Sequence, residues 1–496
     1  MLRLGFGYLW KWLSSGVELL KLLGVTANIL KGLIWRQIRP GNGFDPSHNA
    51  GGLWLGIALT FRVSLLYDQS VMRKMKNFNR LIPKVTFAVF LVVMALLTMH
   101  DARAQYSGIN DDIARYRKGQ LIVNAKPGDK VTVEQLRHEF WFGAAISNGF
   151  GSGSMSAEDL KQYSEIFLAN FNSAVTENAV KWPSMEPQQG QVNYKVVDGI
   201  LEWTEMNDIP LRAHNLFWGI PNRVQPWLKE MDDKELLQTM QNRAETVTKR
   251  YKGRFAEYDL NNEMIHGNYY EERFGPEITK LMTEWAHNGD PDSKLFLNDY
   301  DILTGNKLPE YMAHIRKLLG QGVPIAGIGV QGHLHAETFD RGELRRSLDS
   351  LALFDLPIRI TEFNVPGQRS KYHVEKIRTM TPAEEKLKAK ELVDYYKICF
   401  AHPAVEGILM WGFWEGANWI PVSSLYKRDW SPTPAAEAYR NLIFKEWWTT
   451  ESGKANMDGV FTVPAFYGKY RVTVNGVSRE VELSKAEGKV VVEFVK

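Results

Sequence analysis

Residues 255–263 read FAEYDLNNE, a short stretch in which apolar residues alternate before two asparagines and a glutamate follow. The alternation predicts a β-strand that ends at Asn262. A carboxamide and a carboxylate are poor material for a hydrophobic core. Their position at the end of a strand therefore favours a role in chemistry, and it raises the question of whether other strands of the chain end in the same way.

Seven other stretches share the short length and apolar character of 255–262, and longer segments with helical spacing, such as 240–253 and 382–400, lie between them. The eight repeats predict an α/β fold, a (β/α)8 TIM barrel over residues 138–445 with its functional site at the carboxyl ends of the strands. An open doubly wound sheet is the alternative, but no glycine-rich phosphate fingerprint follows an early strand. The other predicted strands are 140–146, 171–175, 210–216, 294–300, 325–334, 357–365 and 405–414.

Two β-rich pieces flank the predicted barrel. Residues 105–137 form a short N-terminal β segment, in which 119–137 is predicted to be a hairpin that turns at Pro127-Gly128-Asp129. Residues 446–496 form a small C-terminal β-rich module, with Asn475-Gly476 as a second hairpin turn. This module has few aromatic residues and short strands, so we interpret it as a packing appendage rather than a sugar-binding module.

A targeting signal is predicted at residues 72–104, where basic residues precede the apolar run 85–99 and the small-residue site Ala102-Arg103-Ala104. This order is typical of a cleaved secretory signal peptide, and the run is shorter than the roughly 20 residues that a spanning helix needs. We therefore expect a secreted or periplasmic protein that begins near Gln105. The alternative for residues 72–104 is a signal anchor that stays uncut. Residues 1–71 are interpreted as a misassigned upstream segment, and the alternative there is a basic amphipathic membrane helix at 9–36.

The composition excludes several classes of protein. An apolar fraction of 44% and a charged fraction of 24% are ordinary for a soluble globular chain, and a net charge of +3 gives no sign of a nucleic-acid partner. The single Cys399 permits no intrachain disulfide and lacks the partners of a metal site. We expect no cofactor, no metal and no membrane contact in the mature form, and a monomer. The 16 tryptophans suit a large core, and also a cleft that stacks on sugar rings.

Polar and aromatic side chains follow nearly every predicted strand, and a barrel brings such positions to one face. Taken singly, each has an ordinary structural explanation. His333 could be a hydrogen-bonded histidine in the core, Trp218 could fill space in the core, and Lys181 could be a solvent-exposed charge in a loop. Their joint occurrence at the strand ends of one barrel is better explained by a binding cleft. These residues are Glu177, Asn178, Lys181, His214, Trp218, Asn262, Glu263, Asn298, Asp299, Tyr300, Gln331, His333, Glu362, Trp411 and Trp419.

Glu263 and Glu362 follow the fourth and seventh predicted strands and suit glycoside hydrolysis, in which one carboxyl protonates the leaving oxygen and the other attacks the anomeric carbon or activates water. Strands that face each other across a barrel can hold the two a few ångströms apart, which favours the retaining route. Asn262 can then bind the sugar 2-hydroxyl. The alternative is that both glutamates are buried partners in ion pairs. Only two basic residues, Lys181 and Arg359, lie near them in the motifs, which makes this alternative the weaker one.

At these residues the sequence resembles glycoside hydrolase family 10, the endo-β-1,4-xylanases. The resemblance covers most of residues 130–445, and seven segments follow in the order and spacing of the family. They are TENAVKWPSMEPQQGQVNY (176–194), RAHNLFW (212–218), NNE (261–263), LFLNDY (295–300), GIGVQGHL (327–334), ITEF (360–363) and MWGFWEGANW (410–419). KVTVEQLRHEFWFG (130–143) and LYKRDWSPTPAAEAYRNLI (425–443) further resemble the plant-like branch at its first and last strands.

The resemblance implies that Glu263 is the general acid/base and Glu362 the nucleophile. It also implies that Gln331 and His333 support the two glutamates, and that Tyr300 belongs to the substrate-binding set. Glu177, Asn178, Lys181, His214 and Trp218 would line the glycone side of the scissile bond, and Trp411 and Trp419 would form a platform under two sugars. The chain departs from the family at Asn364, where an aspartate is usual, and we expect the missing charge to weaken the pull on His333.

These observations predict a secreted, retaining endo-β-1,4-xylanase that acts on xylan or xylo-oligosaccharides. Lys181 and the crowded strand end at Glu177-Asn178 favour a pentose as the substrate sugar, because a pentose lacks the C6 hydroxymethyl group of a hexose. A barrel glycosidase that acts on another β-1,4 glycan would keep the same glutamates and is one alternative. A non-catalytic polysaccharide-binding protein is the other, but binding alone needs no proton donor.

Overall fold

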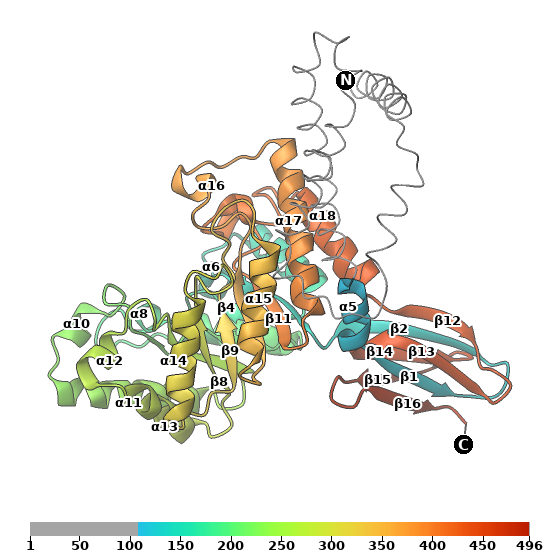
Figure 1. Cartoon of the computed structure of the whole chain (residues 1–496), viewed down its shortest axis with the longest axis horizontal. Helices are drawn as coiled ribbons and strands as arrows, with labels where there is room; N and C mark the ends of the chain where they lie inside the picture. The colour runs from blue at the N-terminus through green and yellow to red at the C-terminus, as the bar shows by residue number, and fades with distance from the viewer. Residues whose placement is uncertain (1–107, 496) are drawn as a thin grey trace, which may run out of the picture. The chain divides into compact units, whose positions relative to one another are not determined.

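The computed structural model of the protein describes residues 108–495 (Figure 1). The predicted signal peptide at 72–104 and the upstream segment 1–71 therefore lie outside the described residues. Within residues 108–495, no helix combines the length and the apolar character that a membrane span requires.

A closed parallel barrel forms the centre of the described chain, which confirms the predicted fold class. Its strands follow the order β5-β4-β3-β11-β10-β9-β8-β7-β6, and a direct pairing of β5 with β7 closes the ring. Nearly every strand residue is buried, as expected for a parallel sheet covered on both faces. The strands are β3 (Trp141–Ile146), β4 (Ser173–Thr176), β5 (Leu211–Ala213), β6 (Phe217–Trp218), β7 (Glu257–Asn262), β8 (Leu295–Asp299), β9 (Gly327–Val330), β10 (Ile358–Phe363) and β11 (Val405–Met410).

All eight predicted strands are present, and the third is interrupted. The segment predicted at 210–216 contributes β5, and the chain then resumes as the two-residue strand β6. β6 pairs with the end of β7, so that Trp218 lies opposite Asn262. The interruption thus brings the indole of Trp218 beside the strand end that carries Glu263.

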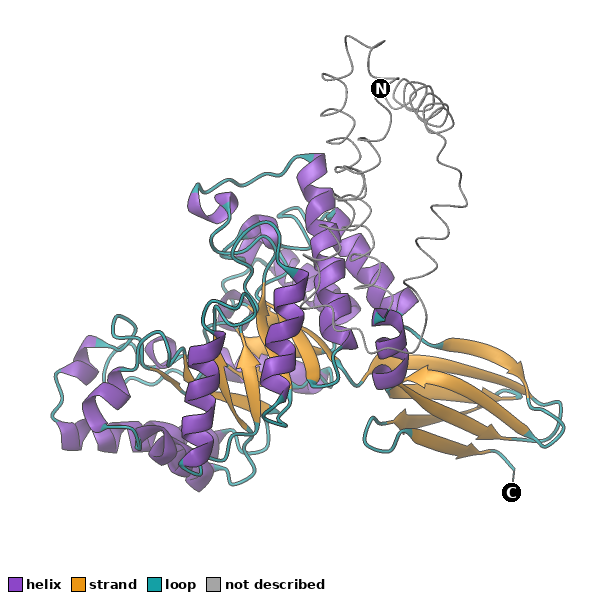
Figure 2. Cartoon of the chain, in the orientation of Figure 1, coloured by secondary structure: helices purple, strands orange, loops and turns teal. Residues whose placement is uncertain are grey.

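Each barrel strand is followed by a longer helix, and Figure 2 shows these helices in purple around the orange strands. Local signals start several of them: Asp232 and Glu235 form a capping box before α11, and Thr381 and Glu384 form another before α17. The main helices that follow the barrel strands are α7 (Ala157–Asn170), α9 (Lys195–Met206), α11 (Asp233–Arg250), α13 (Ile278–Gly289), α14 (Leu308–Gly320), α15 (Arg341–Ala352), α17 (Pro382–Ala401) and α18 (Pro434–Asn441). The other helices are α5 (Ile109–Arg117), α6 (Asn148–Ser152), α8 (Trp182–Met185), α10 (Pro226–Lys229), α12 (Tyr269–Phe274), α16 (Lys371–Val374), η2 (Glu415–Ala417), η3 (Pro421–Ser423) and η4 (Leu442–Glu446).

The two flanking β pieces join in one sandwich of two sheets, ordered β13-β1-β16 and β12-β2-β14-β15. Figure 1 shows the blue strands β1 and β2 among the red strands from the C-terminal end. A separate apolar core lies between the sheets, with Leu121, Val133 and Tyr470 among its members. The strands are β1 (Lys118–Asn124), β2 (Lys130–His138), β12 (Thr450–Lys454), β13 (Val460–Phe466), β14 (Gly468–Val474), β15 (Val477–Leu483) and β16 (Lys489–Glu493).

The predicted hairpin at 119–137 is wrong, because β1 and β2 belong to different sheets and do not pair. The chain does turn at Pro127-Gly128, but it turns from one sheet to the other. The predicted turn at Asn475-Gly476 is confirmed: both residues have positive φ, +47° and +86°, and they join the antiparallel pair β14 and β15.

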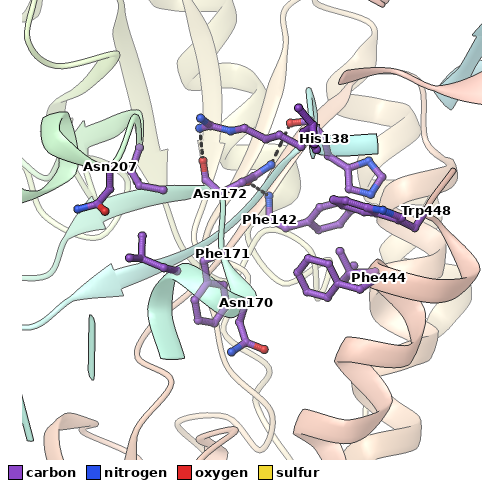
Figure 3. A pocket seen from close by; sticks show the side chains of 13 residues that line it. His138, Phe142, Asn170, Phe171, Asn172, Asn207, Phe444 and Trp448 are labelled. Carbon is purple, nitrogen blue, oxygen red and sulfur yellow. Dashed lines mark hydrogen bonds between the residues drawn. The ribbon is translucent and has the colours of Figure 1, made fainter. Parts of the chain in front are cut away.

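A cavity of about 180 Å³ lies at the amino-terminal end of the barrel strands (Figure 3). Most of its lining residues precede barrel strands: Asn170 and Asn172 come before β4, and Asn207 comes before β5. The polar side chains in view are largely occupied, since Asn172 binds the backbone of His138, Phe140 and Phe142. This end of the barrel is therefore a structural junction, apart from the predicted functional face.

A chain of buried charges runs through the barrel interior. Arg212 of β5 donates to Glu257 and Asp259 of β7, and Arg359 of β10 donates to Glu257 from Nε and Nη2, both at 3.1 Å. None of these side chains is more than 7% exposed. Burial opposes the ionisation of Glu257, but the two arginines outweigh it and lower the pKa of this carboxyl.

The charge chain gives a test of stability. Arg212→Met removes a buried cation and leaves two carboxylates short of a partner, so we expect the free energy of unfolding to fall by about 3–5 kcal/mol. Arg346→Met is the matched control, because Arg346 pairs with Glu343 at the exposed surface of α15, where the loss should be below about 1 kcal/mol. Urea unfolding measures both. If both variants lost the same free energy of unfolding, the charge chain would not be a special source of stability.

Candidate active site

The carboxyl ends of the barrel strands place the predicted site residues on one face. Glu263 follows β7 directly and has a φ of +63°, a left-handed conformation that is uncommon outside glycine. Its amide nitrogen donates to the carbonyl of Asn298 at 2.9 Å, which fixes the turn at the end of the strand. Backbone strain of this kind gathers at functional sites.

Two neutral donors hold the Glu263 carboxylate. Trp218 Nε1 donates to one oxygen at 2.8 Å and Gln331 Nε2 donates to the other at 2.8 Å. Glu263 is partly exposed, in contrast to the buried residues that precede it on β7. The arrangement fixes the direction of the carboxyl without placing a cation in direct contact with it.

Glu362, near the end of β10, lies in a contrasting environment. It is 5% exposed, and Asn298 Nδ2 donates to Oε1 at 3.0 Å while His333 Nε2 lies 3.1 Å from Oε2. His214 Nε2 is 3.9 Å from Oε1. Burial alone would raise the pKa of Glu362, but His214, His333 and Lys181 outweigh it and lower the pKa to about 2. The buried carboxyl is therefore held as an anion, which is the state that a nucleophile requires.

The amide of Asn298 connects the two strands that carry the glutamates. Its Nδ2 donates to Asn262 Oδ1 at 2.9 Å as well as to Glu362, and its Oδ1 accepts from Thr361 at 2.6 Å. No residue in the described part of the chain accepts a hydrogen bond from Asn262 Nδ2, so this nitrogen is left to donate to a ligand. Sequence reasoning placed Asn298 among the strand-end residues of the cleft, but it did not predict that this amide would link Asn262 to Glu362.

Asn364 takes the place of the family's aspartate and is fully hydrogen-bonded. Its Nδ2 donates to the Trp411 carbonyl at 3.3 Å and to Ser423 at 3.0 Å, so Oδ1 is the acceptor that faces His333 Nδ1 at 2.8 Å. His333 Nδ1 therefore carries a proton, and Nε2 can donate to Glu362 only when the ring is doubly protonated. Glu362 has its low pKa with Asn364 in place. The expected weakening of the pull on His333 stays a prediction.

Lys181 lies among the carboxylates of the site. It is buried, donates to Asn178 Oδ1 at 2.8 Å, and lies 4.8 Å from the centre of the Trp218 ring and 5.5 Å from that of Trp411. Burial lowers the pKa of Lys181, while Glu362, Glu263 and Glu177 oppose the shift. One cation thus interacts with three carboxylates that come from different strands.

The remaining predicted residues lie around this centre. His214 binds Asp259 through Nδ1 at 2.8 Å, and its ring lies 5.2 Å from Trp411. Trp419 is 39% exposed and donates to Asn364 at 3.2 Å. Tyr300 stacks on His266 at 3.6 Å between ring centres, a contact that sequence reasoning missed because His266 follows the NNE motif in a loop. Among residues 108–495, no group of three or more potential metal ligands comes together.

Comparison with known proteins agrees with this geometry. Residues 133–442 match the model of glycosyl hydrolase family 10, which is more than half of the chain. The chain belongs to glycosyl hydrolase family 10. The fold and the predicted family resemblance are thereby confirmed, and plant proteins are among the family members similar to it.

Two curated relatives show the range of proteins that contain such a domain. Endo-1,4-beta-xylanase 1 of Arabidopsis thaliana is 35% identical over 70% of this chain and 34% of its own length. Anti-sigma-I factor RsgI6 of Acetivibrio thermocellus is 34% identical over 74% of this chain and 46% of its own length. The chain thus spans only about a third to a half of these relatives.

Solved structures of family 10 xylanases superpose on the barrel. Xylanase 10B from Thermotoga petrophila RKU-1, in complex with xylobiose, matches with a TM-score of 0.55 and 28% identity over 62% of this chain and 95% of that one. Native xylanase 10B from Thermotoga maritima gives the same TM-score and identity.

Glu177 provides a test of the cleft electrostatics. Burial raises the pKa of Glu177 to about 7, against Lys181 and Asn178, so this carboxyl is neutral below about pH 7 and ionised above it. An anion accepts hydrogen bonds from sugar hydroxyls more strongly than a neutral carboxyl by about 1 kcal/mol. We expect KM to fall by about fivefold between about pH 6 and about pH 8 in the wild type.

Glu177→Gln should abolish this change in KM, because the amide cannot ionise. Glu451→Gln, at an exposed position of β12, is the matched control and should keep the wild-type profile. Initial rates across the pH range provide the measurement. A Glu177→Gln profile that follows the wild type would show that Glu177 does not bind substrate as an anion.

Proposed function

We propose that the protein is an exported, retaining endo-β-1,4-xylanase that acts as a monomer on xylan or xylo-oligosaccharides. The observation that carries the proposal is the contrast between its two glutamates. Glu362 is buried and kept ionised by surrounding donors and cations, whereas Glu263 is partly exposed and held by two neutral donors. This division suits a nucleophile and a proton-transferring acid.

The proposed reaction proceeds in two displacements. In the first step Glu263 gives its proton to the leaving glycosidic oxygen while a Glu362 oxygen bonds to the anomeric carbon. In the second step Glu263 takes a proton from water, and the resulting oxygen nucleophile displaces Glu362. Asn262 Nδ2 is free to donate to the sugar 2-hydroxyl in both steps.

The preference for xylan rests on the crowded side of the cleft. Lys181 is buried against Asn178 and close to the Trp218 and Trp411 rings, so little room is left beside it. A pentose carries no hydroxymethyl group at C6 and suits such a wall. Two similar solved structures are named xylanases, and one of them holds xylobiose, which supports the same substrate class.

A second candidate function is polysaccharide binding without turnover. One relative with 34% identity is named an anti-sigma factor, so a similar domain also occurs in a protein with a regulatory name. Binding alone requires neither an ionised, buried Glu362 nor a positioned Glu263. Both features favour catalysis in this chain.

The substrate and the roles of the glutamates can be tested together. We expect the wild type to release reducing ends from xylan in preference to β-1,4 glucan and mannan. Glu263→Ala should lose roughly 10²–10⁴-fold or more on xylan, yet still form a glycosyl-enzyme from substrates with good leaving groups. Added azide should then give the β-glycosyl azide, whereas Glu362→Ala with azide should give the α product by a single inversion.

NMR of the azide products assigns the two roles independently of family resemblance. The opposite pairing of products, or inversion of the anomeric centre by the wild type, would show that the assignment is wrong. Binding of xylan with no release of reducing ends by the wild type would instead favour the second candidate function.

Export forms a separate part of the proposal, supported by the order of basic, apolar and small residues at 72–104. We expect export to remove everything up to about Ala104. N-terminal sequencing of the exported protein is the measurement, and recovery of an intact residue 1 would contradict it.

A further inference from the structure

A polar hollow of about 570 Å³ lies beside Trp419. Its lining comes from two loops that follow barrel strands: Arg378 lies after β10, and Glu415 and Arg428 lie after β11. Both loops are at the carboxyl ends of their strands, so the hollow is on the same face of the barrel as the two glutamates.

The hollow has an excess of positive charge. Arg378 and Arg428 are both exposed, and neither guanidinium forms an ion pair with any residue from 108 to 495. Glu415 is the one acidic residue in the lining, and its carboxylate accepts a hydrogen bond from the backbone nitrogen of Arg428 at 3.0 Å. Two guanidinium groups are thus left to bind an anion from solution.

Trp419 connects this hollow to the reaction centre. Its indole nitrogen donates to Asn364 at 3.2 Å, and its ring centre lies 5.3 Å from that of His333, which contacts Glu362. A sugar chain that stacks on Trp419 would therefore border both the nucleophile and the two arginines. An anionic group attached to that chain is the natural partner of the hollow.

We propose that Arg378 and Arg428 form a subsite for a carboxylate-bearing branch, a uronic acid, on the xylan backbone. The inference rests on the proposed xylanase function and adds a substrate preference to it. A guanidinium binds a carboxylate through two parallel, charge-assisted hydrogen bonds, which are stronger than the bonds it forms to neutral sugar hydroxyls. Because both arginines are exposed, water and salt screen the interaction, and its effect is modest.

The test compares three xylo-oligosaccharides: an unbranched one, the same one with a single glucuronic acid branch, and the branched one with its carboxyl group reduced to an alcohol. Two ratios are measured: kcat/KM for the oligosaccharide with the acidic branch, divided by kcat/KM for the unbranched one and by kcat/KM for the one with the reduced branch. We expect the wild type to favour the acidic branch by about threefold to tenfold, and higher ionic strength to reduce this preference.

Arg378→Gln together with Arg428→Gln should bring both ratios close to one while kcat/KM on the unbranched oligosaccharide stays unchanged. Arg471→Gln is the matched control, since Arg471 pairs with Glu480 at the exposed surface of the β-sandwich. A wild-type ratio that survives the double substitution, or equal rates on the acidic and reduced branches, would overturn the proposal.

Separate measurements distinguish an error in the proposed subsite from an error in the proposed function. Hydrolysis of the unbranched oligosaccharide by the wild type tests the function alone. Calorimetric binding of the three oligosaccharides to Glu362→Ala, with and without the arginine substitutions, tests the subsite without turnover. Equal affinities for the acidic and reduced branches in that experiment would overturn the subsite whether or not the wild type is active.

Discussion

The buried charges inside the barrel are the constraint on which the site depends. Charges in a core must be paired, and Arg212 pairs with Glu257 and Asp259 across the contact of β5 with β7. Arg359 brings β10 into the same network. A slip of one residue between these strands would turn each charge toward the opposite face, so the ion pairs specify the register of the barrel.

The same network reaches the candidate active site through Asp259. This carboxylate binds Nδ1 of His214, whose Nε2 lies 3.9 Å from Glu362. Paired charges deep in the barrel thus orient a ring that helps to keep a buried carboxyl ionised. The stability of the barrel and the electrostatics of the candidate site are therefore linked, because both depend on the same ion pairs.

Much of the fold could be predicted from local sequence. The barrel strands are short apolar runs with polar ends, and the turn at Asn475-Gly476 is fixed by residues that tolerate positive φ. The error at 119–137 has a physical cause: Pro127-Gly128 specifies that the chain reverses, but not which strand becomes the partner of β1. That partner, β13, lies more than three hundred residues away in the sequence.

By itself, the sequence determined which side chains stand at the strand ends, and with them the pair Glu263 and Glu362. Only the tertiary structure decided what each carboxyl meets: Trp218 and Gln331 at one, Asn298 and two histidines at the other. These contacts join different strands, so they depend on strand register and barrel closure. Local sequence encodes neither, because both are settled by the packing of residues that are distant along the chain.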